Sequence, residues 1–331
     1  MVTLAPEIPA QKACIPMTLT PAHYPVLLHE AVDALAPRAD GRYLDGTFGG
    51  GGHTAALLAA STPAGRVLSL DADPAAIARG EALRAEAGGR LTLQQGNFAE
   101  LSDFAKASDF APLDGILLDL GLSSFQLADA ERGFSFATDG PLDMRFGPGA
   151  SETAAAIING RDETELADLI FLYGEERWAR RIARAIVRER ERAPIETTGS
   201  LAAIVARAVA SSGAGRERIH PATRTFQALR IAANRELAVL EEALAGALTV
   251  LAPGGRLAII AFHSLEDRIV KLFMRREATD CICPPQVPVC ICDHRATLRL
   301  VTRKGLRPTE AEVAENPRSR SAILRVAERL P

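Results

Sequence analysis

Four consecutive glycines stand between an acidic residue and a histidine in the segment DGTFGGGGHT, which runs from Asp45 to Thr54. Ordered glycine costs backbone entropy, so a run of four predicts that another group comes very close to the main chain. The bare amides of such a turn, followed by the start of a helix, favour polar or anionic groups of a ligand. A glycine-rich turn that binds no ligand is the alternative.

Three ligand classes use glycine-rich turns of this kind. A P-loop requires G-x-x-x-x-G-K-[ST], and no lysine follows these glycines, so a P-loop is excluded. A dinucleotide-binding turn fits, because Gly50 to Ala55 satisfies G-x-G-x-x-A and Asp71 or Asp73 follows at a suitable distance. An S-adenosylmethionine-dependent methyltransferase also fits, with Asp45 ending one strand and Asp71 ending the next, both as candidate cofactor contacts. The pattern favours the methyltransferase, and a dinucleotide-dependent oxidoreductase stays open.

Two later segments suit the methyltransferase interpretation. GNF, which ends at Phe98, suits a contact to adenine, and DLG, which begins at Asp119, stands where methyl transfer occurs in that fold. Many amino-methyltransferases carry an Asp/Asn-Pro-Pro-aromatic motif there, whereas this chain has DLGLSS. We expect Asp119 to hold either the accepting amine or the amino end of the cofactor, with Ser123 and Ser124 as further catalytic candidates. A capping role for Asp119 is the structural alternative.

The segments around these residues alternate between short apolar runs and helical patterns. Strands are predicted at 42–47, 66–73, 90–98, 113–121, 254–264 and 320–328. The run LDGILLDLG is almost continuously apolar, which is typical of a strand covered on both faces of a parallel sheet. From about residue 133 to residue 248 the sequence predicts helices and no convincing strand, including one long helix across 225–248. This pattern indicates an α/β sheet interrupted by a helical insert.

The predicted organisation has three parts. Residues 21–135 and 245–331 form the α/β domain, residues 136–244 form an all-helical insert for substrate recognition, and residues 1–20 form a flexible tail. The 331 residues carry a net charge of −3, which does not by itself indicate a nucleic-acid partner, although a local basic patch is compatible with it. Neither a signal peptide nor a membrane span is recognisable, so we expect a cytoplasmic protein.

The helical insert contains the basic segment RWARRIARAIVRER. Helical spacing places Arg180 and Arg184 on one basic face and apolar residues on the other. A second cluster includes Arg216, Arg218 and Arg224, and together the clusters predict a phosphate-binding surface for RNA. An ordinary solvated arginine face is the alternative.

Four of the five cysteines lie in CICPPQVPVCICDH, at Cys281, Cys283, Cys290 and Cys292. Four thiols in this C-x-C-x6-C-x-C arrangement predict a structural zinc site, although each pair is closer than the usual C-x2–4-C spacing. Reduced thiols in a proline-rich loop and disulfides are the alternatives.

Eight segments, in the same order, resemble the bacterial RsmH (MraW) family between about His23 and Arg329. They are HYPVLLHEAV, YLDGTFGGGGHT, DGILLDLGLSSFQLADAERGFSF, DGPLDMR, YGEERWARRIARAIV, HPATRTFQALRI, PGGRLAIIAFHSLEDRIVK and ENPRSRSAILRVAER. Members of this family are 16S ribosomal RNA (cytosine-N4)-methyltransferases.

The resemblance implies a class I (Rossmann-like) methyltransferase sheet with a helical insert. It implies S-adenosylmethionine as the cofactor, and as the target a decoding-region cytosine of 16S rRNA within the assembled small ribosomal subunit. The implied cofactor contacts are Gly51, Gly52, His53, Asp71, Phe98, Asp119 and Gln126. His53 then belongs to the cofactor loop, with a general base as the alternative. His263 either faces the substrate or is a structural turn residue. An RNA-binding assembly factor without turnover is a further alternative.

Overall fold

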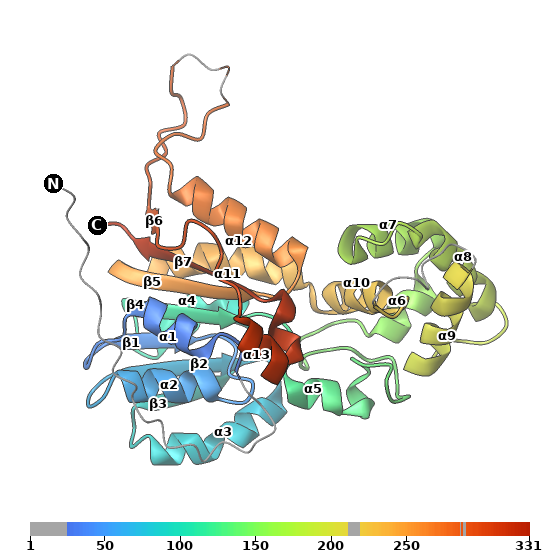
Figure 1. Cartoon of the computed structure of the whole chain (residues 1–331), viewed down its shortest axis with the longest axis horizontal. Coiled ribbons are helices and arrows are strands. Elements are labelled where there is room, and N and C mark those ends of the chain that lie inside the picture. The colour runs from blue at the N-terminus through green and yellow to red at the C-terminus, as the bar shows by residue number, and fades with distance from the viewer. Residues whose placement is uncertain (1–24, 211–218, 285, 287–288) are drawn as a thin grey trace.

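The computed structural model describes residues 25–210, 219–284, 286 and 289–331. The expected tail at residues 1–20 and the basic residues Arg216 and Arg218 lie outside this range. The sheet has the strand order β3-β2-β1-β4-β5-β7-β6 (Figure 1). Its strands are β1 (Arg42–Asp45), β2 (Arg66–Asp71), β3 (Leu91–Gln95), β4 (Leu113–Asp119), β5 (Leu251–Ala261), β6 (Leu298–Leu300) and β7 (Ile323–Arg329).

The first five strands are parallel, and β7 runs antiparallel to both β5 and β6. The strand order reverses beside β1, which pairs with β2 on one side and β4 on the other. In an open α/β sheet, the crevice beyond the carboxyl ends of the strands at such a point is where ligands bind. The predicted Rossmann-like α/β sheet is therefore confirmed.

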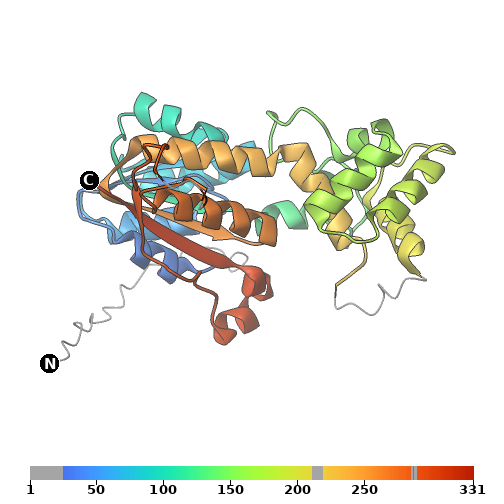
Figure 2. The same cartoon turned by 90° about the horizontal axis from the view of Figure 1, so that it is seen from above.

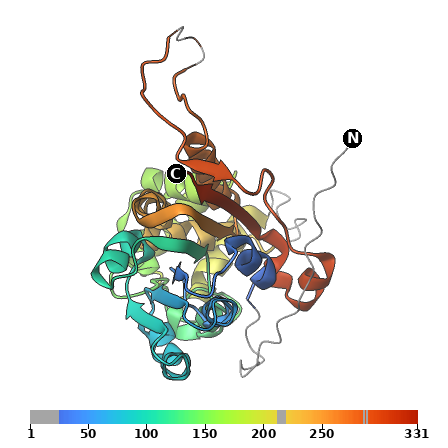
Figure 3. The ribbon, with the colours of Figure 1, turned by 90° about the vertical axis from the view of Figure 1, so that its left-hand side faces the viewer.

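Helices cover both faces of the sheet (Figure 3). One core packs α4 (Leu101–Ala107), α11 (Glu236–Val250) and α12 (Ser264–Glu277) against the strands; the other packs α1 (Leu28–Leu35), α2 (Gly52–Ala60) and the end of α3 (Pro74–Glu86). Adjacent residues of β4 point to opposite faces, because Leu117 belongs to the second core and Leu118 to the first. The nearly continuous apolar run in β4 follows from this burial on both sides.

The insert forms a helical unit beside the sheet (Figures 1 and 2). Its helices are α6 (Ala154–Gly160), α7 (Glu163–Gly174), α8 (Ala179–Arg190), α9 (Thr198–Val209) and α10 (Thr223–Asn234). A separate hydrophobic core runs through it from Phe134 to Ala233. Its described residues contain no strand, only an isolated bridge between Pro141 and Thr197. Within the described residues, no helix has the length and apolar character that crossing a membrane requires.

The single long helix predicted across residues 225–248 is wrong. α10 ends at Asn234, and Arg235 adopts a left-handed conformation with φ 51° and ψ 34° before α11 begins. Tertiary hydrogen bonds fix the break: Asn234 donates to the Met144 carbonyl at 2.7 Å and accepts from the Phe146 amide at 2.8 Å. Helix periodicity in the sequence continues across this point, so the sequence alone gives no signal for it.

The break also separates the core of the insert from the core in which α11 packs against the sheet. Ala233 belongs to the core of the insert, whereas Leu240 and Leu244 of α11 pack against the sheet. The expected domain boundary at residues 244 and 245 falls inside α11, and we propose that the insert ends at Arg235. The sequence also predicts neither α1 nor the three-residue β6, both of which are short.

The left-handed backbone at Arg235 yields a test. Glycine adopts this conformation without the penalty of about 1 kcal/mol that other residues incur, whereas alanine is favoured by a similar amount inside a helix. Arg235→Gly should therefore be about 1 kcal/mol more stable than Arg235→Ala in urea-induced unfolding. Both variants lose the exposed pair with Glu242, so that pair cancels in the comparison. Greater stability of the alanine variant would mean that the helix is continuous.

Candidate active site

A cavity opens at the carboxyl edge of the sheet, between the sheet and the insert. One wall comes from the turns after β1, β2, β3 and β4. The opposite wall comes from the insert, from α11 and from the segments around α12 and α13 (Glu310–Glu315). Of the predicted site residues, the structure brings Gly52, His53, Asp71, Phe98, Asp119, Ser123, Ser124 and Gln126 to this cavity.

The glycine turn is shaped in part by the protein itself. Gly51 has φ 78° and caps α2, and a Cβ on it would lie 2.7 Å from the Phe48 ring. A Cβ on Gly52 would lie 2.1 Å from Pro25 Cγ. The sequence predicts that another group comes close to the glycine main chain. At Gly51 and Gly52 that group is a side chain of the protein itself, Phe48 or Pro25. Gly51 does not line the cavity, whereas Gly46 to Gly50 and Gly52 do.

Asp45 lies beneath the cavity and does not line it. Its side chain is fully buried and accepts hydrogen bonds from the Thr47 amide at 3.1 Å, the Thr47 hydroxyl at 3.3 Å and the Thr54 hydroxyl at 2.6 Å. Burial raises its pKa, against these hydrogen bonds, which lower it. The structure therefore places Asp45, a predicted cofactor contact, behind the residues that line the cavity, where it holds the turn after β1.

Thr47 connects Asp45 to the end of β4. Its hydroxyl donates to Asp45 and accepts a hydrogen bond from the Asp119 amide at 2.7 Å. This chain of hydrogen bonds fixes the backbone from which the Asp119 side chain enters the cavity.

Asp119 has a buried carboxyl oxygen, Oδ1, with no hydrogen-bond partner among the described residues. Its other oxygen lies 3.6 Å from Nδ1 of His53. Burial, with the nearby charges of Asp45 and Glu266, raises the pKa of Asp119 well above its usual value. A buried acceptor without a donor carries an energetic cost, which a ligand donor or a cation would offset.

His53 lies in the first turn of α2, and its Nε2 is 3.2 Å from the Val26 carbonyl. A hydrogen bond from His53 to both partners requires a proton on each ring nitrogen, because the Val26 carbonyl and an ionised Asp119 carboxylate both accept. The ring is buried. This placement suits a residue that positions Asp119.

Asp71 and Phe98 line the cavity from the ends of β2 and β3. Asp71 accepts hydrogen bonds from the Gly49 amide at 2.7 Å and the Asp73 amide at 2.8 Å. Burial outweighs these bonds and raises the pKa of Asp71 to about 6. Phe98 follows Asn97, whose side chain caps the short turn by accepting from the Ala99 amide.

The DLGLSS segment leads into α5 (Ser124–Ala128) through a capping box. The Ser123 hydroxyl accepts from the Gln126 amide, and the Gln126 side chain accepts from the Ser123 amide. Gln126 also donates to Asp73 at 3.3 Å. The Ser124 hydroxyl accepts from Arg318. These side chains line the cavity, but their described polar contacts also serve the local structure.

The opposite wall holds residues that the sequence analysis did not identify. Asn234, Glu236 and Glu266 line the cavity. Glu236 pairs with Arg230 through two contacts of 2.7 and 2.9 Å across the helix break. Asn234, Glu236 and Glu266 lie far from the glycine turn in the sequence, so only their shared location in the fold identifies them as cavity residues.

The carboxylate of Glu266 lies beside His263, which caps α12. His263 Nδ1 accepts from the Glu266 amide at 3.4 Å, and Nε2 lies 3.1 Å from a Glu266 carboxyl oxygen. Burial raises the pKa of Glu266, but this histidine and the Arg230 charge bring it below the usual value. His263 does not line the cavity, so its structural interpretation is favoured.

The predicted RNA-binding arginines lie in the insert, away from the lining of this cavity. Arg180 and Arg184 are exposed on α8, and Arg184 lies 3.4 Å from Glu163. Ile182 and Ile186 fill the buried face, so the predicted amphipathic helix is confirmed. Arg224 lies on α10, is one-third exposed and approaches the buried Glu176 at 3.6 Å.

A family model described as the MraW methylase family matches residues 20–330. The ribosomal RNA small subunit methyltransferase H of Thermomicrobium roseum is 59% identical over 312 residues, covering 94% of this chain and 95% of the relative. The proteins of the same name from Dehalococcoides mccartyi and Heliobacterium modesticaldum are 53% and 51% identical and cover 93% of this chain, with 86% and 98% of the relatives covered.

The buried position of Asp45 predicts a loss of stability on its removal. Asp45→Ala leaves the Thr47 amide without its acceptor and should lower the free energy of unfolding by roughly 3 kcal/mol. Asp45→Asn retains one acceptor oxygen and should lose less. The exposed Asp33→Ala is the control and should change stability by less than about 0.5 kcal/mol. An Asp45→Ala protein as stable as the control in urea unfolding would refute this structural role.

Proposed function

Because the chain belongs to the MraW methylase family, we propose that it is an S-adenosylmethionine-dependent methyltransferase of small-subunit ribosomal RNA. More finely, we propose that it methylates the exocyclic N4 amine of a cytosine in the decoding region of 16S rRNA. The single observation that carries the chemistry is the unpaired, buried oxygen of Asp119 at the carboxyl end of β4. The family match and the names of the relatives support the substrate class.

The acidic lining favours S-adenosylmethionine over a dinucleotide. Asp71 and Asp119 lie beside the glycine turn, where the pyrophosphate of a dinucleotide would bring negative charge close to both. S-adenosylmethionine instead carries a sulfonium and an ammonium group, whose positive charges suit the acidic residues that line this cavity. The residues present therefore fit this cofactor, and we infer that Asp71 holds its ribose hydroxyls and Phe98 contacts its adenine.

When bound, S-adenosylmethionine supplies an activated, electrophilic methyl group. The protein's task is then mostly to position the amine, which is a poor nucleophile because its lone pair is delocalised into the cytosine ring. We propose that Asp119 Oδ1 accepts a hydrogen bond from the N4 amine and draws the lone pair out of conjugation. An ionised Asp119 at this position can also take the proton that the amine releases on methylation.

Ser123 and Ser124 lie next to Asp119 along the cavity wall and are proposed to contact the cytosine. Phe146 and Asn234 approach from the insert side. A cytosine must leave its stack to enter such a cavity, and the insert supplies the wall that it would meet. We propose the assembled small subunit in the cytoplasm as the setting, with Arg180, Arg184 and Arg224 contacting RNA phosphates.

The proposed reaction is tested by methyl incorporation from labelled S-adenosylmethionine into unmethylated small subunits, free rRNA and DNA, followed by nucleoside analysis. N4-methylcytidine in the subunit is the expected product. Asp119→Ala should reduce turnover by at least about 100-fold, because the amine loses its acceptor.

Cofactor affinity separates the two roles of Asp119. If Asp119 contacts the amine, its alanine variant should bind S-adenosylmethionine within a few-fold of the parent protein. A large loss of cofactor binding would instead assign Asp119 to the amino end of the cofactor, and near-normal turnover would remove it from the mechanism. Asp114→Asn on the same strand is the control, because Asp114 pairs with Arg38 outside the cavity.

Loss of phosphate contacts on α8 should weaken RNA binding uniformly and lower its salt dependence. The double variant Arg180→Ala/Arg184→Ala should reduce the slope of log affinity against log salt by about 2, with cofactor affinity unchanged. Arg84→Ala is a matched control, since Arg84 is exposed on α3 and, like Arg184, pairs with a glutamate on the surface. An unchanged salt slope would leave α8 as an ordinary solvated face.

A further inference from the structure

The chain between α12 and β6 forms an arm that projects from the sheet domain (Figure 1). None of its described residues between Ala278 and Thr297 is buried, and Val289 and Ile291 are 71% and 76% exposed. At the base of the arm, the Thr297 amide donates a hydrogen bond to the Glu277 carbonyl at 2.7 Å. The described part of the arm therefore has no apolar core of its own to define its shape, a condition in which small segments use disulfides or a metal.

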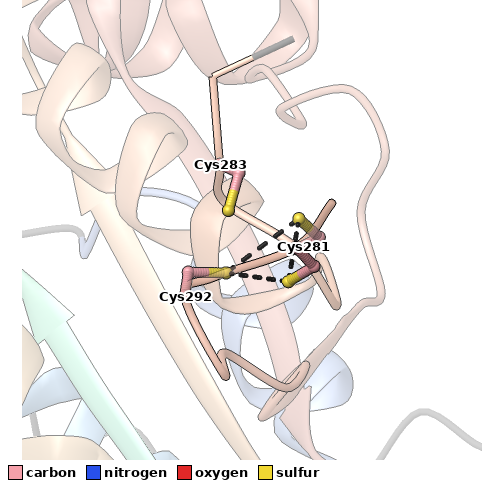
Figure 4. A group of neighbouring side chains, drawn as sticks. Cys281, Cys283 and Cys292 are labelled. Carbon is pink, nitrogen blue, oxygen red and sulfur yellow. Dashed lines mark hydrogen bonds between the residues drawn. The ribbon is translucent and has the colours of Figure 1, made fainter. Parts of the chain in front are cut away.

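The four cysteines of this arm bring their sulfur atoms together (Figure 4). Sγ of Cys281 lies 3.5 Å from that of Cys290 and 4.0 Å from that of Cys292, and Cys290 and Cys292 are 3.6 Å apart. Cys283 completes a group whose ligand atoms all lie within 4.8 Å of one another. Four sulfurs at the zinc–sulfur distance of about 2.3 Å, arranged as a tetrahedron, are about 3.8 Å apart. The observed separations match that geometry.

The separations do not match disulfides. A disulfide holds its sulfurs at about 2.05 Å, and all four cysteines are free thiols in the structure. The three measured pairs have nearly equal separations, so no pair is singled out for bonding.

Backbone amides support the sulfurs in a reciprocal way. The Ile282 amide, between Cys281 and Cys283, donates to Cys292 Sγ at 3.4 Å. The Ile291 amide, between Cys290 and Cys292, donates to Cys283 Sγ at 3.4 Å. Each C-x-C pair thus supplies a donor to a sulfur of the other. Such bonds stabilise thiolate charge, as the outer contacts of a metal centre do. They also show how two C-x-C pairs, closer than the usual spacing, form one centre.

We propose that Cys281, Cys283, Cys290 and Cys292 bind one structural Zn²⁺ ion that fixes the arm. His294 is not a ligand, because its Nε2 faces the Arg276 carbonyl at 3.1 Å. The four cysteines do not line the cavity, so the ion takes no part in methyl transfer and the proposal is independent of the proposed function.

Metal analysis of the full-length protein, expressed with added zinc and kept reduced, should find about one zinc per chain. Replacement by Co²⁺ should give the strong thiolate-to-metal charge-transfer band and the intense visible bands of a tetrahedral thiolate site. Cys281→Ser and Cys290→Ser should each lose most of the zinc. His294→Ala and Cys14→Ser, which alters the cysteine outside the cluster, should keep it.

Cofactor binding and circular dichroism of each variant identify any that fail to fold. Titration of Co²⁺ into wild-type protein whose zinc has been removed by a chelator tests the site without any variant, so a variant that fails to fold does not affect the result. Absence of zinc together with absence of the cobalt bands in the reduced wild-type protein would overturn the proposal. So would zinc that persists when all four cysteines are replaced by serine.

Discussion

The hydrogen bonds that join Asp45, Thr47 and Asp119 are the constraint on which the cavity depends. They connect the turn after β1 to the last residue of β4 across two neighbouring parallel strands. Asp45 is fully buried, so its oxygens require donors from within the protein, and Thr47 and Thr54 provide them. The glycine turn can then take its left-handed conformation at a fixed place beside Asp119.

The acidic groups of this region show how Asp119 differs from its neighbours. Glu236 is paired with Arg230, Glu266 with His263, and Asp71 accepts two backbone amides. Each buried carboxylate thus has compensation, as burial of charge requires. Asp119 keeps one oxygen without a partner among the described residues, in a cavity open to a ligand. Of the described buried side-chain atoms without a hydrogen-bond partner, only Asp119 Oδ1 belongs to a residue that lines this cavity, where an amine or a cation can meet it.

The left-handed residue between α10 and α11 gives the cavity its second wall. It lets one helix pack in the insert and the next pack on the sheet, so that Asn234 and Glu236 stand at the junction. The pair of Arg230 and Glu236 spans this break, and Glu175 of the insert contacts Ser264 and Arg268 of α12. The core of the insert is separate from the cores of the sheet domain, but these polar contacts define how the insert and the sheet domain meet.

The sequence by itself determined the α/β sheet, the helical insert, the glycine turn and the family. Strand and helix periodicities are local properties, and long motifs in a fixed order are specific, so these predictions need no tertiary information. It also grouped Asp71, Phe98 and Asp119, because each ends or follows a parallel strand and such ends meet at one edge.

Only the tertiary structure placed Asp45 below the cavity, divided the long helix at Arg235, and brought Asn234, Glu236 and Glu266 to the site. Each depends on partners distant in the chain, such as the Met144 carbonyl that binds Asn234. It likewise brought the sulfur atoms of four cysteines in two short pairs within 4.8 Å of one another. Residue spacing fixes what is near along the chain, whereas hydrogen bonds and packing between distant segments decide what is near in space.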